Sequence, residues 1–307
     1  MWYQFKAFVS GLCFILVLLC AHPAGASALE ESCDPRLQQG LEDILAALGL
    51  DRAVADRNLC VVLADITEPE APRVALANPN HMMYAASLPK IAILLGAFER
   101  IGRGEMALDQ PTLDQLQSMI RRSSNTAATE MLNRVGPDFL LEVLQSPRYR
   151  LYDPAANGGL WVGKEYSSAA ARKRDPLHNI SHGATALQVA RFYYLLETGA
   201  LVSPEHSRTM KQILGDPGIN HKFVKGLLAA YPDSRIFRKS GTWQDFHADS
   251  ALIEHAGHRY IAVALSRSPD GGRWLSELIL GLDGLVCRPE PLPAKGAPPP
   301  PELAKAH

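Results

Sequence analysis

The stretch Ser87-Leu88-Pro89-Lys90, continued by the apolar run 91–101 (IAILLGAFERI), decides both the fold and the chemistry predicted for this chain of 307 residues. Proline suits a first helical turn, so we predict a helix from about Ser87 to Ile101. On such a helix, Lys90 lies one turn beyond Ser87 on the same face. The pair therefore joins a hydroxyl nucleophile to an amine that takes its proton, once burial and nearby cations lower the amine pKa.

The start of this helix offers a second catalytic element. Backbone N–H groups at a helix N-terminus are suited to stabilise an oxyanion. The alternative interpretation is a helix cap followed by a surface lysine, because Ser-x-x-Lys occurs by chance in many chains. Further motifs are therefore needed to decide between the two.

Ser123-Ser124-Asn125 is the second motif, placed between predicted helices at 112–122 and 126–135. A second serine there is able to relay a proton between the lysine and a leaving nitrogen, and the asparagine amide is able to hold a substrate carbonyl or the lysine. The alternative is a pair of helix-capping residues, since serine and asparagine favour that position.

Lys239-Ser240-Gly241-Thr242 is the third motif, on a strand predicted over Arg235–Trp243. The lysine offers a cation, the serine a hydroxyl for a carboxylate, and the glycine allows a substrate backbone to approach closely. The alternative is an edge strand with a solvated lysine.

Taken together and in this order, the three motifs resemble those of the penicillin-recognising serine enzymes, the β-lactamases and the DD-peptidases. The resemblance covers about Cys33–Cys287 and is strongest to class A β-lactamases, although Ser124 stands where that branch commonly has aspartate. It implies an α+β fold, with a five-stranded antiparallel sheet flanked by helices and an all-helical lobe beside it. The active site is then expected between the two lobes.

The resemblance also implies a role for each motif residue. Ser87 is acylated, Lys90 is its base, and Ser123 passes the proton onward. Backbone N–H groups of Ser87 and Thr242 form the oxyanion hole. The implied substrate-binding residues are Asn125, Lys239, Ser240, Gly241 and Thr242.

The chain departs from class A enzymes in the loop that supplies their deacylating glutamate. Their E-x-x-L-N motif is missing from 148–182, where Glu165 is the only glutamate. Glu165 is our candidate base for deacylation, and the alternative is a salt-bridging loop residue. The spacing from Ser87 to Ser123 is also shorter than in class A enzymes, which predicts a more open cleft.

The ends of the chain are predicted to lie outside the folded domain. Residues 1–28 have the charge, apolar run and small residues of a secretory signal, the alternative being an uncleaved membrane anchor. Residues 29–288 form the domain, with an α/β lobe from 29–84 and 186–288 and a helical lobe at 85–185. The Pro-rich tail 289–307 is predicted to be disordered.

Composition sets limits on partners and location. With a formal net charge of −1, the chain gives no electrostatic reason to bind nucleic acid. We expect an exported monomer, periplasmic or extracellular, without stable membrane insertion after signal cleavage. In such a compartment a disulfide between Cys33 and Cys287 is one of several pairings open to the three remaining cysteines.

No cofactor or metal is expected. Asp175, His178 and His182 have no recognisable ligand spacing. His247 is weighed as an alternative water-activating residue against a structural turn, Asp249 as a residue that faces the cleft, and Trp161, Tyr166 and Trp243 as groove-lining or packing side chains.

Three functions follow from the sequence. The first is hydrolysis of a β-lactam or related amide through an acyl-enzyme on Ser87. The second is a DD-peptidase-like enzyme that acts on peptidoglycan stem peptides and deacylates slowly after reaction with β-lactams. The third is a catalytically silent binding module, which the intact motifs argue against.

Overall fold

The computed structural model describes residues 28–288. The predicted signal, except for its last residue, and the Pro-rich tail 289–307 lie outside the described residues. None of the helices in the described part is both long and apolar enough to cross a membrane.

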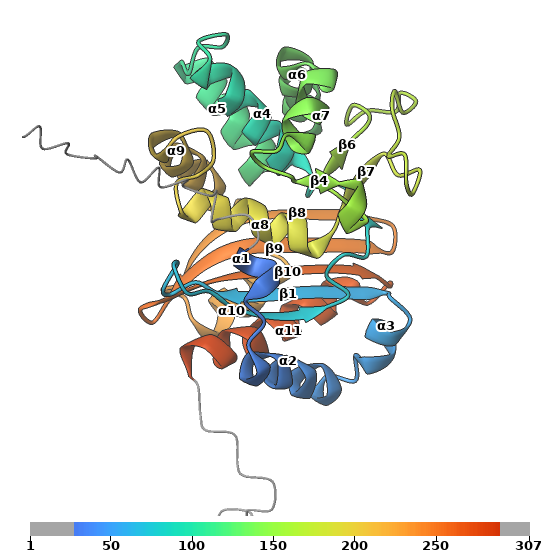
Figure 1. The fold of residues 1–307 in the computed structure, drawn as a ribbon, viewed down its shortest axis with the longest axis vertical. Helices are drawn as coiled ribbons and strands as arrows, with labels where there is room; N and C mark the ends of the chain where they lie inside the picture. The colour runs from blue at the N-terminus through green and yellow to red at the C-terminus, as the bar shows by residue number, and fades with distance from the viewer. Residues whose placement is uncertain (1–27, 289–307) are drawn as a thin grey trace, which may run out of the picture.

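A five-stranded antiparallel sheet forms the centre of the molecule (Figure 1). Its spatial order is β2-β1-β10-β9-β8, so β8 is an edge strand. The strands are β1 (Leu59–Asp65), β2 (Arg73–Ala77), β8 (Arg235–Trp243), β9 (Phe246–His255) and β10 (His258–Arg267). The predicted fold class, α+β with this sheet, is confirmed.

Helices cover both faces of the sheet, because successive side chains of each strand point to opposite faces and are buried in two separate cores. Along β1, Cys60, Val62 and Ala64 belong to one core, whereas Val61 and Leu63 belong to the other. The first face carries α8 (Ala186–Glu197) and α9 (Pro204–Leu214). The second carries α2 (Pro35–Ala47), α10 (Phe223–Ala230) and α11 (Gly271–Cys287).

A group of helices stands beyond α8, away from the sheet (Figure 1). It consists of α4 (Lys90–Gly102), α5 (Gln110–Arg121), α6 (Asn125–Val135) and α7 (Pro137–Gln145). Short pieces complete the chain: α1 (Ala28–Glu31), α3 (Asp51–Ala55), β3 (Met83–Tyr84), β4 (Tyr152–Asp153), β5 (Gly158–Gly159), β6 (Trp161–Val162) and β7 (His182–Ala184).

The structure corrects three details of the predicted elements. The main helix of the first motif begins at Lys90, because residues 86–89 form a turn before it. Segment 148–182, where the resemblance predicts a loop, contributes short strands that pair with one another and with β7. Helix α10 was not predicted, because its eight residues are too few to show a helical period.

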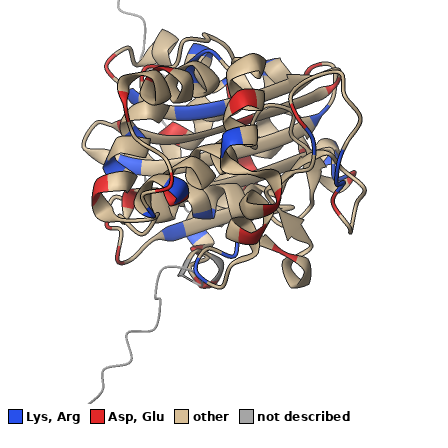
Figure 2. Cartoon of the chain, turned by 90° about the horizontal axis from the view of Figure 1, so that it is seen from above, with Lys and Arg blue, Asp and Glu red and all other residues tan. Residues whose placement is uncertain are grey.

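Charges and cysteines bear on the predicted partners. Figure 2 shows basic and acidic segments interspersed over the molecule rather than gathered by sign.

In the described part of the chain Cys33, Cys60 and Cys287 are all free thiols, so the structure forms no Cys33–Cys287 disulfide.

Candidate active site

Ser87 lies in the tight turn that leads into α4. Pro89 caps the helix, and the Lys90 N–H reaches back to the Ser87 carbonyl at 3.3 Å. Ala86 adopts a left-handed backbone with φ of 51°, a conformation that costs energy for a residue with a side chain. The Ser87 side chain is half-buried, and its hydroxyl has no hydrogen-bond partner within residues 28–288. It is therefore free to meet a substrate.

Lys90 is fully buried at the start of α4, with 0% of its surface exposed. Its Nζ donates to Asn125 Oδ1 at 2.8 Å and to the Ser123 carbonyl at 2.6 Å, and lies 3.4 Å from Ser123 Oγ. Burial lowers the pKa of this amine to about 7. Near neutral pH much of Lys90 is therefore uncharged, the form that accepts a proton from a hydroxyl.

Ser123 connects the helical group to the sheet. Its Oγ accepts a hydrogen bond from Lys239 Nζ at 2.9 Å and also lies 3.4 Å from Lys90 Nζ. Ser123 holds a left-handed backbone, φ 56°, in the connection between α5 and α6. Burial, and then the nearby charge of Lys90, hold the pKa of Lys239 well below its ordinary value. The second motif, which contains Ser123, and the third, which contains Lys239, thus meet at the Ser123 hydroxyl.

Gly241 brings strand β8 against the Ser87 turn. A side-chain carbon at Gly241 would lie 2.0 Å from the Ala85 carbonyl oxygen and 2.9 Å from the Ser87 backbone nitrogen. No residue other than glycine fits this approach without a shift of the backbone. The motif places its glycine beside the nucleophile.

The free edge of β8 carries the Thr242 N–H, which the sequence predicts to be the second oxyanion donor. Lys239 Nζ donates to the Ser240 carbonyl at 2.7 Å, so this carbonyl points away from β9. Backbone groups alternate along a strand, so the Thr242 N–H, two residues further on, points to the same edge. The Ser87 and Thr242 N–H groups are then the donors available to an oxyanion.

Substitution of Gly241 by alanine is expected to lower the rate of Ser87 acylation by at least about 100-fold. The added methyl group pushes β8 away from Ala85 and misplaces the Thr242 N–H, and loss of one oxyanion donor costs about 10²–10³ in rate. Acylation by a fluorescent penicillin measures the effect. Gly257→Ala is the control, because no atom lies within 4 Å of its added carbon, although its φ of 82° gives the variant some strain. A parental rate for Gly241→Ala would exclude this account of the oxyanion hole.

Ser240 and Thr242 point toward the segment before α10. Ser240 Oγ lies 3.1 Å from His221 Nε2, and Thr242 Oγ1 accepts from Lys222 Nζ at 2.8 Å. Burial lowers the pKa of His221 to about 4 and that of Lys222 to about 8. Lys222 also donates to the Gly241 carbonyl at 2.6 Å, so it supports the strand that carries the motif.

A buried ion pair holds that segment in place. Arg238 Nε and Nη2 donate to the two carboxylate oxygens of Asp249 at 2.7 and 2.8 Å, and both side chains are almost entirely buried. Asp249 also accepts the Phe223 N–H, and Arg238 donates to the Ile219 and His221 carbonyls. The expectation that Asp249 faces the cleft is therefore wrong; its carboxylate is consumed inside the fold.

Glu165 lies outside the cluster formed by Ser87, Lys90, Ser123 and Lys239. Its Oε1 accepts from Asn133 Nδ2 on α6 at 3.1 Å. The next residue, Tyr166, faces the cluster instead, with its ring centroid 4.5 Å from Lys90 Nζ. Among the described residues, no carboxylate lies within ion-pair distance of Lys90. Glu165 takes part in no salt bridge among residues 28–288; its contacts are hydrogen bonds from Asn133 and Ser167.

Residues 111–280, more than half of the chain, match the model of a protein family described as the beta-lactamase enzyme family. The chain belongs to the β-lactamase enzyme family. No curated protein sequence matches this chain.

Solved structures support the fold of this family member. A β-lactamase from Sphaerobacter thermophilus is 15% identical, with a TM-score of 0.64 over 81% of this chain and 97% of its own. PBP-A is 17% identical, with a TM-score of 0.61 over 84% and 96%. A class A representative from Bacteroides cellulosilyticus is 17% identical, with a TM-score of 0.61 over 82% and 99%. At such identities the likeness is one of fold.

Sequence reasoning missed two residues of this β-lactamase family site. His221 and Lys222 carry no motif, and their segment shows no period that would place it beside β8. Of the aromatic residues weighed earlier, Tyr166 lines the site, Trp161 packs in the core against Tyr152, and Trp243 is exposed at the end of β8. The His182 ring packs at a tilt of 37° against Tyr166, and burial lowers its pKa to about 4, so it is neutral there.

Proposed function

We propose that this β-lactamase family member is an exported serine hydrolase that is acylated on Ser87 by β-lactams or related amides and deacylates slowly. The observation that supports acylation is the convergence of Lys90 Nζ, Ser123 Oγ and Lys239 Nζ beside the Ser87 turn. The observation that favours slow deacylation is the lack of a carboxylate at Lys90 among residues 28–288.

Acylation follows from the positions of these groups. Ser87 Oγ attacks the amide carbonyl while neutral Lys90 takes its proton, and the two backbone N–H groups hold the oxyanion. Ser123 then receives a proton from Lys90 and gives its own to the leaving nitrogen. The C–N bond breaks and an ester on Ser87 remains.

Deacylation needs a base that activates water, which class A enzymes have as a glutamate. Here Tyr166 occupies the space beside Lys90, and burial raises the pKa of its phenol well above the ordinary value. A protonated phenol is a poor base at neutral pH. The acyl-enzyme is therefore expected to persist, which favours a DD-peptidase-like enzyme on cell-wall peptides over a fast lactamase.

One experiment separates the three functions considered for the chain. The mature protein is mixed with a chromogenic cephalosporin, and both colour and protein mass are followed. We expect one equivalent of colour and a single adduct that maps to Ser87. Sustained turnover would instead support an efficient lactamase, and the absence of both signals would support a binding module.

Replacement of Glu165 by glutamine is expected to leave the deacylation rate within about twofold of the parent. Glu165 hydrogen-bonds Asn133 rather than any group of the cluster, and an amide preserves that contact. The decay of the Ser87 adduct, followed by intact mass, measures this. A tenfold slower decay would identify Glu165 as the deacylating base. Asn133→Asp is a companion variant that alters the same contact without touching the cluster.

A further inference from the structure

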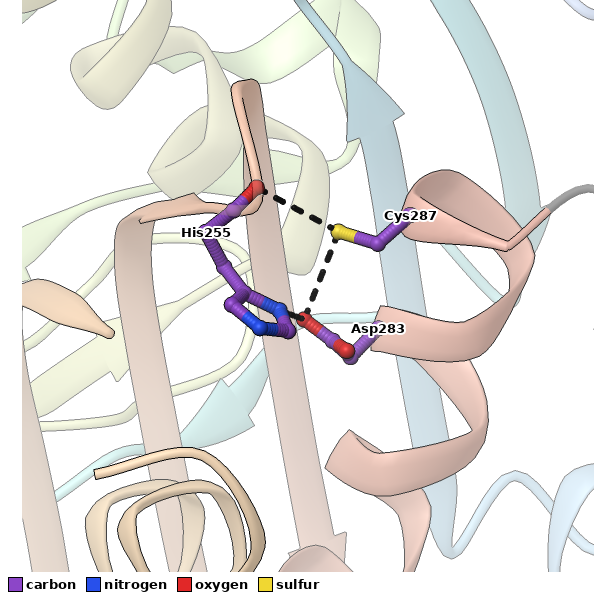
Figure 3. Close-up of side chains that lie close together, drawn as sticks. All are labelled: His255, Asp283 and Cys287. Carbon is purple, nitrogen blue, oxygen red and sulfur yellow. Dashed lines mark hydrogen bonds and ion pairs between the residues drawn. The ribbon is translucent and has the colours of Figure 1, made fainter. Parts of the chain in front are cut away.

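Three metal-binding side chains converge at the end of the sheet where β9 finishes (Figure 3). His255 is the last residue of β9, and Asp283 and Cys287 lie one turn apart at the end of α11. His255 Nδ1 is 2.7 Å from Asp283 Oδ1, and Cys287 Sγ is 3.6 Å from the same oxygen. All three ligand atoms lie within 4.8 Å of one another.

Asp283 is the buried centre of this cluster, with 0% of its surface exposed. Three donors meet at its Oδ1: His255, Cys287 and the Tyr260 hydroxyl at 2.8 Å. Its Oδ2 is also buried and has no hydrogen-bond partner in the described part of the chain. A buried carboxylate oxygen without a partner is costly, and native structures usually give it one.

The surroundings of Asp283 supply little positive charge. Within residues 28–288 its one salt-bridge partner is the imidazole of His255, which is charged only when protonated. The His255 ring is held in place by stacking on Tyr231, with ring centroids 4.5 Å apart. The helix end adds to the demand for a cation, because the C-terminus of a helix carries partial negative charge.

We propose that His255, Asp283 and Cys287 bind a zinc ion. Imidazole nitrogen, carboxylate oxygen and thiolate sulfur are the ligands that Zn²⁺ takes in proteins, and water completes a tetrahedral site. Binding replaces the thiol proton of Cys287, which leaves to solvent. The neutral imidazole binds through Nδ1 and keeps its proton on Nε2.

The proposed ion has a structural role rather than a catalytic one. His255 lies five positions along β9 from Ser250, which pairs with Lys239, so the cluster is roughly 16 Å along the strand direction from the Lys239 position. Zinc there fastens the last helix to the β9–β10 hairpin. No metal is expected from the sequence, because His255 lies 28 positions before Asp283 and the three residues form no recognisable ligand motif.

Zinc binding to the chelator-treated mature protein, measured by calorimetry, tests the proposal. We expect one equivalent to bind, the Tm to rise by at least about 3 °C at saturation, and acylation of Ser87 to stay unchanged. Cobalt is the spectroscopic probe, since a Co²⁺–thiolate bond gives a charge-transfer absorption band. No stoichiometric binding, or cobalt bound without that band, would overturn the proposal.

Matched variants locate the ion. Cys287→Ser and His255→Gln are expected to weaken zinc binding by at least about tenfold, whereas Cys33→Ser, which removes an exposed thiol, keeps it. Zinc should also protect Cys287, but not Cys33, from alkylation, a readout that needs only the folded parent protein. Equal binding by Cys287→Ser, or equal alkylation with and without zinc, would show a hydrogen-bonded cluster without a metal.

Discussion

Replacement of Lys90 by methionine is expected to slow the acylation of Ser87 by about 10³-fold, because the hydroxyl loses its base. In the parent protein, burial lowers the pKa of Lys90 to about 7. The neutral amine fraction therefore grows as the pH rises through 7. The acylation rate should climb from pH 6 to pH 8 and then level off, with its midpoint near pH 7.

The pH profile identifies Lys90 as the source of that rise. In Lys90→Met the residual acylation should show no rise centred near pH 7, since the remaining buried amines contact Ser123 and β8 rather than replace the base. Stopped-flow measurement with a fluorescent penicillin gives both profiles. Ser87→Ala is the control and should form no adduct at any pH. An unchanged profile in Lys90→Met would assign the base to another group.

The resting contacts of Lys90 explain why substrate is needed to complete the site. Its Nζ is engaged by the Ser123 and Ser124 carbonyls and by Asn125 Oδ1, and not by Ser87. Catalytic hydrogen bonds are often long in free enzymes and shorten when substrate is bound. We expect a substrate carbonyl placed between Ser87 and β8 to compete for Asn125 and so to release Lys90 toward Ser87.

The motif residues could be predicted from the sequence because each depends on local structure. Local pattern places one motif before a helix, one between two helices and one on a strand, and the family resemblance then predicts that the three belong to one site. The structure brings Lys90, Ser123 and Lys239 together by hydrogen bonds and sets Gly241 against Ser87. The sheet could be predicted for the same reason, since its strands alternate or run apolar over five residues or more.

Contacts between distant segments that no motif specifies could not be predicted. Glu165 and Tyr166 are neighbours in the chain, and only Tyr166 faces Lys90. The polar loop 148–182 has no periodic pattern from which the direction of either side chain could be predicted. Asp249 follows the motif strand closely in sequence, and for this reason the sequence suggests that its side chain faces the cleft. Its partner Arg238 stands directly before Lys239, where alternation turns the two side chains to opposite faces of β8.

The Arg238–Asp249 pair gives the largest expected effect on stability. Asp249→Ala leaves the Arg238 guanidinium, 3% exposed, without a counter-charge and the Phe223 N–H without its acceptor. Removing one partner of a buried pair costs about 3–5 kcal/mol. Urea unfolding at pH 7 should show that loss. The Asp249→Ala variant should also be acylated more slowly, because the segment that carries His221 and Lys222 is no longer held beside β8.

Two further variants distinguish a buried charge from a general loss of packing. Glu277→Ala removes the partner of Arg273 in an exposed pair and is expected to change the free energy of unfolding by less than about 1 kcal/mol. The double variant Arg238→Met, Asp249→Leu removes both charges and should recover much of the stability lost in Asp249→Ala, since apolar replacements of buried pairs are often neutral. It should not recover acylation, because Arg238→Met also removes the guanidinium that holds the Ile219 and His221 carbonyls. Recovery of acylation along with stability would mean that the pair serves the fold alone and that the segment before α10 is positioned by other contacts.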